Sequence, residues 1–370
     1  MNIKENCSIF TFRPPGVLKS SVNHSKRLRH PLIPAYERQN LNDLGFEIDP
    51  HNNNLNDILT YIPEGNLFLS ILENAYFIIQ EGFDGVVITN DLQLIDETLH
   101  FCKNQSLDQI KIDLNDAQLL EEIFLAFDPK WMQYDHWMGY CLSKSYLANL
   151  YTPTTMKIAI PEYRNNNIFI GDSISRELYD NTLEKAKLNS RTIFLKDGIY
   201  KAKKLALFHP NSHYPYDYFN FHDTRRIFNF INKNSRYKND LPTNFLIATN
   251  QKNQSCFSDH FQSILTQTCN ELNLPIIHLE NMDWESQIAL FSQAEFIIAP
   301  HCPELINLYF CQNDTTLLEL TSFNKNKSSI SCWPFLIAST NNINYCFIDM
   351  QKDNINIEFL KKTVRNIRAL

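Results

Sequence analysis

The sequence predicts an α/β protein of about two domains. Its 370 residues exceed the roughly 150 residues of a typical single domain. Beyond residue 205, short apolar segments alternate with helical patterns of about ten to fifteen residues, which indicates parallel βαβ units in a doubly wound sheet. Hydrophobic residues make up 44% of the chain and aromatic residues 12%, a composition that excludes disordered and collagen-like chains.

The N-terminal half has a less regular pattern. Residues 13–38 form a basic segment that we interpret as a solvated arm, with weak attraction to anionic lipid or acidic glycan as the alternative. Residues 66–97 contain three β-rich pieces separated by turn residues, which is typical of a meander. Residues 117–127 and 136–150 carry the apolar spacing of helices, and residues 156–160 predict a strand that ends at Pro161.

Strands in the C-terminal half are predicted at 244–249, 275–279, 295–299 and 316–320. Asp223, Ser258 and Asp283 stand where N-caps of the intervening helices are expected, and a short helix should begin at Pro303. Residues 356–370 have the pattern of an amphipathic helix. Ligands of such sheets bind beyond the carboxyl ends of the strands, so functional residues are expected after Ala248, Leu279, Ala299 and Leu318.

Charge and composition exclude several classes of protein. The net charge of −7 disfavours nucleic acid as a partner. The apolar runs are much shorter than the roughly 20 residues of a membrane-spanning helix, and the N-terminus lacks the pattern of a secretory signal. The nine cysteines are scattered, without a Cys-x-x-Cys pair, which favours reduced thiols in the cytoplasm over disulfides or a zinc site. A peripheral contact with the inner membrane is left open.

The strand at 295–299 leads into a candidate anion site. Cys302 falls at the N-cap of the next helix and Pro303 at its first position, so the first amides of that helix face the carboxyl edge of the sheet. His301 lies at its mouth, although an ordinary packed histidine is an equal alternative. Glu319, near the end of the following strand, could accept hydrogen bonds from two ribose hydroxyls, or could instead cap a helix or pair with a lysine.

A second candidate lies in the N-terminal half, where Asp135, His136 and Trp137 are adjacent. They combine an acid, a base and an aromatic platform, and histidine can act as a general base near neutral pH without adjustment. The competing interpretation is that Trp137 belongs to the core and His136 caps a helix.

Three other kinds of site are disfavoured because the sequence motifs that they need are absent. Gly171-Asp172-Ser173 looks like the nucleophile block of SGNH hydrolases, but no Asp-x-x-His follows it, and a serine without a base is a weak nucleophile. No Asp-x-Asp occurs, which disfavours metal-bound diphosphate. No glycine follows Gly198, so the C-terminal half has neither a P-loop nor a Gly-x-Gly-x-x-Gly turn.

Residues 283–320, with Ala299-Pro-His301, Leu305-Ile-Asn307 and Leu317-Leu-Glu319-Leu, resemble the family 61 glycosyltransferases. This family includes capsular polysaccharide enzymes of bacteria and xylosyl- and N-acetylglucosaminyltransferases of eukaryotes. Upstream, residues 72–75 and 85–89 are similar to its N-terminal hairpins, and Tyr134-Asp-His136-Trp137 is similar to its Tyr-x-His-Trp element.

The resemblance implies a GT-B-like α/β fold, in which two Rossmann-like domains face each other across a cleft. Residues 1–205 would form the acceptor-side domain with its β-hairpins, residues 206–350 the donor-side domain, and residues 351–370 a helix that could pack back on the first domain. The implied reaction is inverting, metal-independent transfer from a nucleotide sugar to a polysaccharide or another glycan. His301, Asn307 and Glu319 would hold the donor, and Asp135 or His136 would act as the base. The nucleotide sugar is then a substrate, no cofactor is expected, and the oligomeric state is open.

Two departures from the family pattern concern the donor site. The family turn Gly-Ala-Gly is replaced by Cys302-Pro303-Glu304, whose carboxylate would oppose a diphosphate. Asn250 stands where the family usually has an arginine. Lys252 or Arg226 could rebuild the site; otherwise the chain is a catalytically inactive relative that binds glycan or serves as a scaffold.

Overall fold

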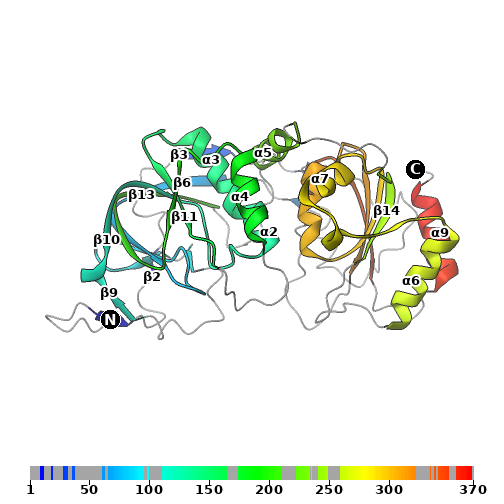
Figure 1. Cartoon of the computed structure of the whole chain (residues 1–370), viewed down its shortest axis with the longest axis horizontal. Coiled ribbons are helices and arrows are strands. Elements are labelled where there is room, and N and C mark those ends of the chain that lie inside the picture. Colours follow the sequence, from blue (N-terminus) through cyan, green and yellow to red (C-terminus); the bar gives the residue numbers. More distant parts are fainter. Residues whose placement is uncertain are drawn as a thin grey trace. The chain divides into compact units, whose positions relative to one another are not determined.

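The computed structural model divides the chain into two compact units, which are residues 1–32 with 65–218 and residues 33–64 with 219–370 (Figure 1). The predicted division at residue 205 falls inside strand β13 (Gly198–Pro210). The structure describes residues 9–11, 18–19, 28–31, 36–37, 61–62, 66–95, 98–99, 111–164, 174–210, 222–233, 235, 241–248, 259–321, 334, 337–338, 341–349 and 356–368.

The large sheet of the first unit is mixed, with the order β12-β11-β10-β13-β6-β7-β8-β2 and β3 beside β6. Strands β10, β11 and β12 run parallel and β13 is parallel to β10, whereas β13 and β6 are antiparallel. Only part of this sheet therefore follows the βαβ pattern expected of a Rossmann-like domain. Its strands are β2 (Leu18–Lys19), β3 (Leu28–Pro31), β6 (Asn66–Ile79), β7 (Val87–Ile88), β8 (Leu94–Ile95), β10 (Gln118–Leu125), β11 (Lys157–Pro161), β12 (Thr192–Leu195) and β13.

Smaller elements accompany this sheet. Strand β1 (Ile9–Thr11) pairs with β9 (Lys111–Asp113), and β4 (Tyr36–Glu37) pairs with β5 (Tyr61–Ile62), both antiparallel. A turn of 3-10 helix, η6 (Leu114–Asp116), precedes β10.

Two sequence predictions for this unit are wrong. Within the predicted helix at 117–127, residues 118–125 form strand β10, and the buried residues Ile123 to Leu125 are paired with parallel strands on both sides. A short apolar run fits a strand and a helix equally well by periodicity. The β-rich pieces at 67–72 and 75–79 are one strand, β6, which pairs with β13 from Leu67 to Ile79.

A helical segment follows β10, as predicted. It consists of α2 (Tyr134–His136), the π-helical turn η7 (Trp137–Leu142) and α3 (Ser143–Tyr151). Trp137 is fully buried, and its Nε1 donates to Thr182 Oγ1 at 2.8 Å. The core interpretation of Trp137 is therefore confirmed. Thr182 belongs to α4 (Arg176–Lys185). Ser175 is the N-cap of this helix, and its Oγ accepts a hydrogen bond from the amide of Leu178.

The second unit confirms the predicted doubly wound sheet. Five described strands lie parallel in the order β15-β14-β16-β17-β18. The strand order reverses between β14 and β16, which is where ligands bind in such folds. The last strand was not predicted. The strands are β14 (Asn244–Ala248), β15 (Ile276–His278), β16 (Phe296–Pro300), β17 (Thr316–Thr321) and β18 (Asn344–Asp349).

Helices cover both faces of this sheet. Alternate side chains such as Ile298 and Leu318 form one core with α6 and α9, while Phe245 on the opposite face contacts Phe291 of α7. Figure 1 shows α7 on one side of β14 and α6 with α9 on the other. The helices are α5 (His222–Lys233), α6 (Asp259–Glu271), α7 (Trp284–Ser292) and α9 (Ile357–Arg368), with the 3-10 helices η9 (Leu279–Asn281) and η10 (Pro303–Phe310).

The predicted N-caps of this unit have different outcomes. Asp223 is not an N-cap, because α5 already includes His222, and Ser258 lies outside the described residues. Asp283 caps α7 by accepting a hydrogen bond from the amide of Ser286 at 2.7 Å, as its position predicts. The C-terminal helix α9 packs against α6 through Leu360 and Val364, and Lys361 Nζ lies 2.7 Å from Glu271 Oε2. This helix therefore has a packing partner within the second unit. Its contact with the first domain stays a prediction.

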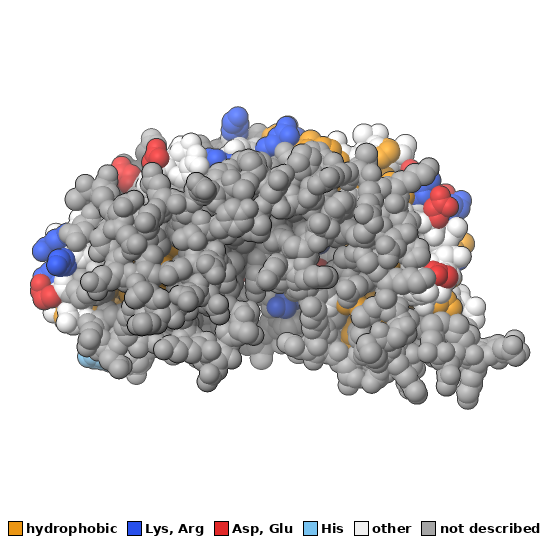
Figure 2. Space-filling view, turned by 180° about the vertical axis from the view of Figure 1, so that it is seen from behind, with side chains coloured by type: hydrophobic (Ala, Val, Ile, Leu, Met, Phe, Trp, Pro, Cys, Tyr) orange, Lys and Arg blue, Asp and Glu red, His pale blue; other side chains and the backbone are white. Residues whose placement is uncertain are grey.

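Charged side chains on the described surface are commonly paired. Lys203 contacts Glu121 at 2.7 Å and Lys204 contacts Glu122 at 2.6 Å across β13 and β10. Figure 2 shows basic and acidic side chains together on the part of the surface that is coloured. Exposed pairs of this kind add little stability. None of the described helices is long and apolar enough to be a candidate membrane span.

Candidate functional site

Three side chains from consecutive strands meet in the second unit. His301 follows β16, Glu319 lies in β17 and Tyr345 lies in β18. His301 Nδ1 is 2.5 Å from Glu319 Oε1, and the Tyr345 hydroxyl donates to Glu319 Oε2 at 2.6 Å. The structure thus brings together two of the residues predicted for the donor site, and adds a tyrosine from the strand that was not predicted.

Glu319 is an unusual residue for its position. It is only 2% exposed and stands in the apolar strand Leu317-Leu-Glu-Leu, in register with Ala299 and Phe347. A buried carboxylate costs free energy unless it is paired, and an apolar residue would fill this place without that cost. A buried, paired carboxylate near the carboxyl edge of a doubly wound sheet is a candidate for a functional role.

The turn after His301 forms as predicted, but as a 3-10 helix. Cys302 is the N-cap with extended backbone, and Pro303 opens η10. Burial, together with the carboxylates of Glu304 and Glu319, raises the pKa of the Cys302 thiol well above its ordinary value. The Glu304 carboxylate, which the sequence placed against a diphosphate, therefore lies beside the Cys302 thiol.

Asn307 is fully buried in η10, and its Nδ2 donates to Gln287 Oε1 at 3.2 Å. Gln287 in turn donates to the carbonyl oxygens of Leu279 and Met282. This chain of hydrogen bonds ties η10 to α7 and η9, so the contacts of Asn307 in the structure are with the protein. Its predicted contact with the donor stays a prediction.

The two basic candidates are placed differently. Arg226 is exposed on α5, next to Arg225, whose Nη2 donates to Asn313 Oδ1 at 2.5 Å. Lys252 lies outside the described residues, as does Gly171-Asp172-Ser173.

In the first unit, His136 has a carboxylate partner that the sequence did not identify. His136 Nδ1 lies 3.4 Å from Asp128 Oδ1, and its ring stacks on Tyr140. Burial would raise the pKa of Asp128, but His136 and Lys144 hold it below its ordinary value. Asp135 is half-buried on the same short helix. Asp128 follows the carboxyl end of β10, a position that was hidden because the sequence predicted a helix there.

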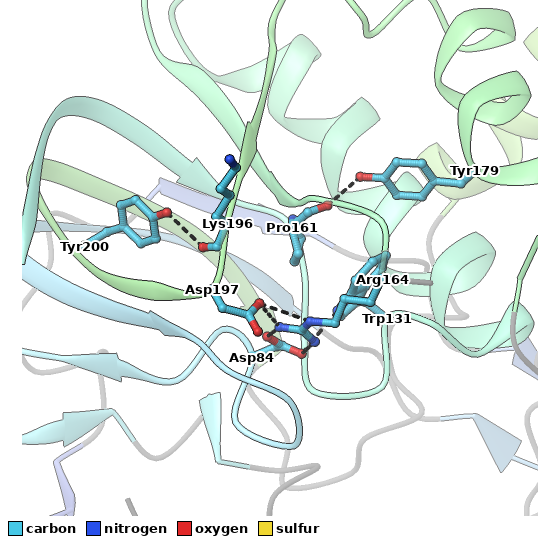
Figure 3. A network of polar contacts seen from close by, with 8 residues as sticks. All are labelled: Asp84, Trp131, Pro161, Arg164, Tyr179, Lys196, Asp197 and Tyr200. Carbon is cyan, nitrogen blue, oxygen red and sulfur yellow. Dashed lines mark hydrogen bonds and ion pairs between the residues drawn. The ribbon is translucent and has the colours of Figure 1, made fainter. Parts of the chain in front are cut away.

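A second ionic network lies beside the carboxyl ends of β11 and β12 (Figure 3). Arg164 forms a two-point contact with Asp84, at 2.6 and 2.7 Å, and also contacts Asp197 at 2.7 Å. Trp131 Nε1 donates to the same carboxylate of Asp84 at 3.2 Å. Nearby, the Tyr163 hydroxyl donates to the carbonyl of Ile174. Arg164 thereby links four segments of the unit that are distant in sequence.

Gly85, the residue after Asp84, has a backbone conformation and a close contact that favour glycine. Its φ is +81°, and an added Cβ would lie 2.6 Å from the carbonyl oxygen of Phe127. We expect Gly85→Ala to lower the free energy of unfolding by about 1–3 kcal/mol, because both the left-handed backbone and the close approach penalise a side chain. Urea denaturation would measure the loss. An unchanged midpoint would show that the segment relaxes and that the close contact is not required.

Asp84 should make stability depend on pH. Burial raises its pKa to about 6, against the opposing effect of Arg164, whereas an unfolded chain has an aspartate pKa near ~3.9. Between these values the folded state retains a proton that the unfolded state has lost, so stability falls as pH rises from about 4 to 6, by roughly 3 kcal/mol. Wild type and Asp84→Asn should therefore differ in the slope of unfolding free energy across this window. Parallel slopes would contradict the prediction.

No group of three or more histidine, cysteine, aspartate or glutamate side chains that could hold a metal ion occurs among the described residues. The metal independence of the reaction stays a prediction.

Comparison with known proteins gives one family match, which covers Asp135 and His136 of the first unit and His301 and Asn307 of the second. The family described as Glycosyltransferase 61 matches residues 134–318, which is half of the chain. The match begins at α2, includes His136, His301 and Asn307, and ends one residue before Glu319. The matched range also includes Gly171-Asp172-Ser173, so this motif can be explained as part of a glycosyltransferase sequence without a hydrolase. A search of curated proteins found no significant match. The match over half its length shows that this chain belongs to glycosyltransferase family 61.

Proposed function

We propose that the protein is an inverting, metal-independent glycosyltransferase that moves a sugar from a nucleotide-sugar donor to a polysaccharide, of the capsular type, or to another glycan. Membership in the family supports glycosyl transfer. The observation that carries the proposal for the donor is the buried Glu319 with His301 at the carboxyl edge of a doubly wound sheet. His301 follows β16, which borders the point of strand reversal, and Glu319 lies in the neighbouring strand β17. Ligands bind beyond the carboxyl ends of the strands at such a point.

In the proposed arrangement the two units form a GT-B-like pair, with the acceptor on the first and the donor on the second. The donor diphosphate would meet His301 and the first amides of η10, which need no metal to stabilise negative charge. Asn307, Glu319, Lys252 and Arg226 complete the proposed donor side.

The chemistry follows from these roles. The acceptor hydroxyl gives its proton to a base, and its oxygen forms a bond to the anomeric carbon from the face opposite the phosphate. The bond between that carbon and the phosphate oxygen breaks, and its electron pair leaves with the nucleoside diphosphate, so the anomeric configuration inverts. We assign the base role to His136, oriented by Asp128 at Nδ1, with Asp135 as the neighbouring acid.

The five described cysteines Cys141, Cys269, Cys302, Cys311 and Cys346 are free thiols. They support action in a reducing compartment, which we take to be the cytoplasm, with a peripheral contact at the inner membrane.

A catalytically inactive, glycan-binding or scaffolding relative is the second candidate. The turn Cys302-Pro303-Glu304 favours it, because a proline and a carboxylate stand where the family has small residues that let a phosphate approach.

Calorimetry with a panel of nucleotide sugars, with and without EDTA, tests the proposal. We expect one donor to bind equally well in both buffers, and its hydrolysis or transfer to be lost in His136→Ala. NMR of the product should show inverted anomeric configuration. Absence of binding throughout the panel would favour the inactive relative, and retained configuration would exclude the inverting reaction.

A further inference from the structure

The His301, Glu319 and Tyr345 side chains form a cluster with a buried end and an exposed end. The Glu319 side chain is 2% exposed, whereas that of His301 is 30% exposed. Glu319 engages Nδ1 of the ring, and in a protonated imidazole Nε2 is a donor as well. We propose that Glu319 and Tyr345 are positioning residues that hold His301 as an imidazolium and present its Nε2–H to the diphosphate of the donor. This inference rests on the proposed function.

The contacts of Glu319 argue against a direct role in binding ribose. One of its oxygens lies 2.5 Å from His301 and the other accepts from Tyr345 at 2.6 Å. The carboxylate is buried in the face of the sheet. A ribose could reach it only by displacing His301 or Tyr345, and either change would leave a buried polar group without its partner.

The charges around His301 support an imidazolium. A carboxylate within hydrogen-bond distance favours the protonated ring, and in that form both ring nitrogens are donors. Glu319 contacts the ring, and Tyr345 donates to the other oxygen of the same carboxylate. Cys302, the N-cap of η10, and Glu304 in its first turn follow His301 in the chain. Cys302 stays neutral, because burial and the two carboxylates raise its pKa well above the ordinary value. The local charge therefore comes from the imidazolium and two carboxylates.

This arrangement gives the cation a function in the reaction. As the bond between the anomeric carbon and the phosphate oxygen breaks, its electron pair passes to that oxygen. A donor already in place beside this oxygen stabilises the new charge without reorganisation. The Tyr345 hydroxyl fixes the rotation of the Glu319 carboxylate, so that Oε1 continues to face His301.

Calorimetry with UDP, GDP, CDP and ADP and with the corresponding nucleosides tests the inference at pH 6, 7 and 8. We expect Glu319→Gln and His301→Asn each to weaken binding of the preferred diphosphate about tenfold to a hundredfold, since each removes a charge-assisted contact. Nucleoside binding should change less than about twofold, and the double variant should be no weaker than either single variant. Tyr345→Phe should have a smaller effect of the same kind. Wild-type affinity should fall as pH rises, and in Glu319→Gln this fall should occur at lower pH.

Thr315→Val is the matched control. It also removes one buried hydroxyl from the second unit, where Thr315 Oγ1 donates to the carbonyl of Ala294 just before β17. We expect it to leave nucleotide binding unchanged. A loss equal to that of Tyr345→Phe would reduce the cluster to a purely structural role and overturn the inference.

The remaining outcomes separate the inference from the proposed function. If Glu319→Gln weakens nucleosides as much as diphosphates, Glu319 binds ribose, and the inference fails while the function stands. The same holds if Glu319→Gln binds diphosphate as wild type does. If wild type binds no diphosphate, both fail. NMR of the ligand-free protein labelled with ¹⁵N-histidine should show a protected Nδ1 proton that disappears in His301→Asn and in Glu319→Gln. Its persistence in Glu319→Gln would overturn the orientation of the ring independently of any ligand.

Discussion

Arg164→Met is expected to lower the free energy of unfolding by about 3–5 kcal/mol, because it leaves the Asp84 carboxylate buried without its two-point partner. Asp84 is 1% exposed, and Arg164 contacts both of its oxygens. Among the described side chains, the Trp131 indole would then remain as a neutral donor to Asp84. Urea denaturation followed by circular dichroism would measure the change.

The loss should depend on pH in a defined direction. Burial already raises the pKa of Asp84 to about 6, and the hydrogen bonds and positive charge of Arg164 oppose this increase. In Arg164→Met the pKa of Asp84 should therefore be higher still. The deficit relative to wild type should therefore be small near pH 5 and grow as pH rises above about 6.

Two variants control this experiment. Asp197→Asn removes the other carboxylate of the network, whose side chain is 65% exposed, and should cost less than about 1 kcal/mol. Adding Asp84→Asn to Arg164→Met should restore part of the stability, because a neutral amide is less costly to bury. If the double variant is no more stable than Arg164→Met, the network does not act through the charge of Asp84.

His301→Ala is expected to lower the rate of glycosyl transfer about 100-fold to 1,000-fold, as is typical when one preorganised donor to a developing negative charge is removed. The loss should appear in kcat more than in KM, because the phosphate charge grows as the donor bond breaks. Steady-state kinetics with the preferred nucleotide sugar would measure it.

His278→Ala is the matched control for this prediction. His278 ends the edge strand β15, where it lies 3.3 Å from Glu280, and its removal should leave kcat within about twofold of wild type. Equal losses in the two variants would indicate general damage to the sheet. An unchanged rate in His301→Ala would remove His301 from the donor site.

Much of the second unit could be predicted because its information is local. Helical and strand patterns alternate, Asp283 stands at an N-cap, and Pro303 at the start of η10. The rule that parallel strands end at one edge then placed His301 and Glu319 together, and the structure confirms this proximity. The first unit was harder, because a buried strand such as β10 has the same apolar run as a buried helix.

The candidate sites depended more on long-range contacts. Asp128 was missed as the partner of His136 because the strand before it was mistaken for a helix. Tyr345 was missed because its strand lay beyond the predicted alternation. Arg164 and Asp84 are 80 residues apart, and neither lies in a motif with a known spacing.

Caps, turns and periodicity act over a few neighbouring residues, so the amino-acid pattern was enough to predict the alternation of strands and helices in the second unit up to β17. Which side chains pair with one another became known from the folded structure. Glu319 is hydrogen-bonded to His301 and Tyr345, and Asp84 is hydrogen-bonded to Arg164. The reason is physical: a carboxylate removed from water must find partners wherever the packed chain brings them, and that choice is made by the whole fold rather than by adjacent residues.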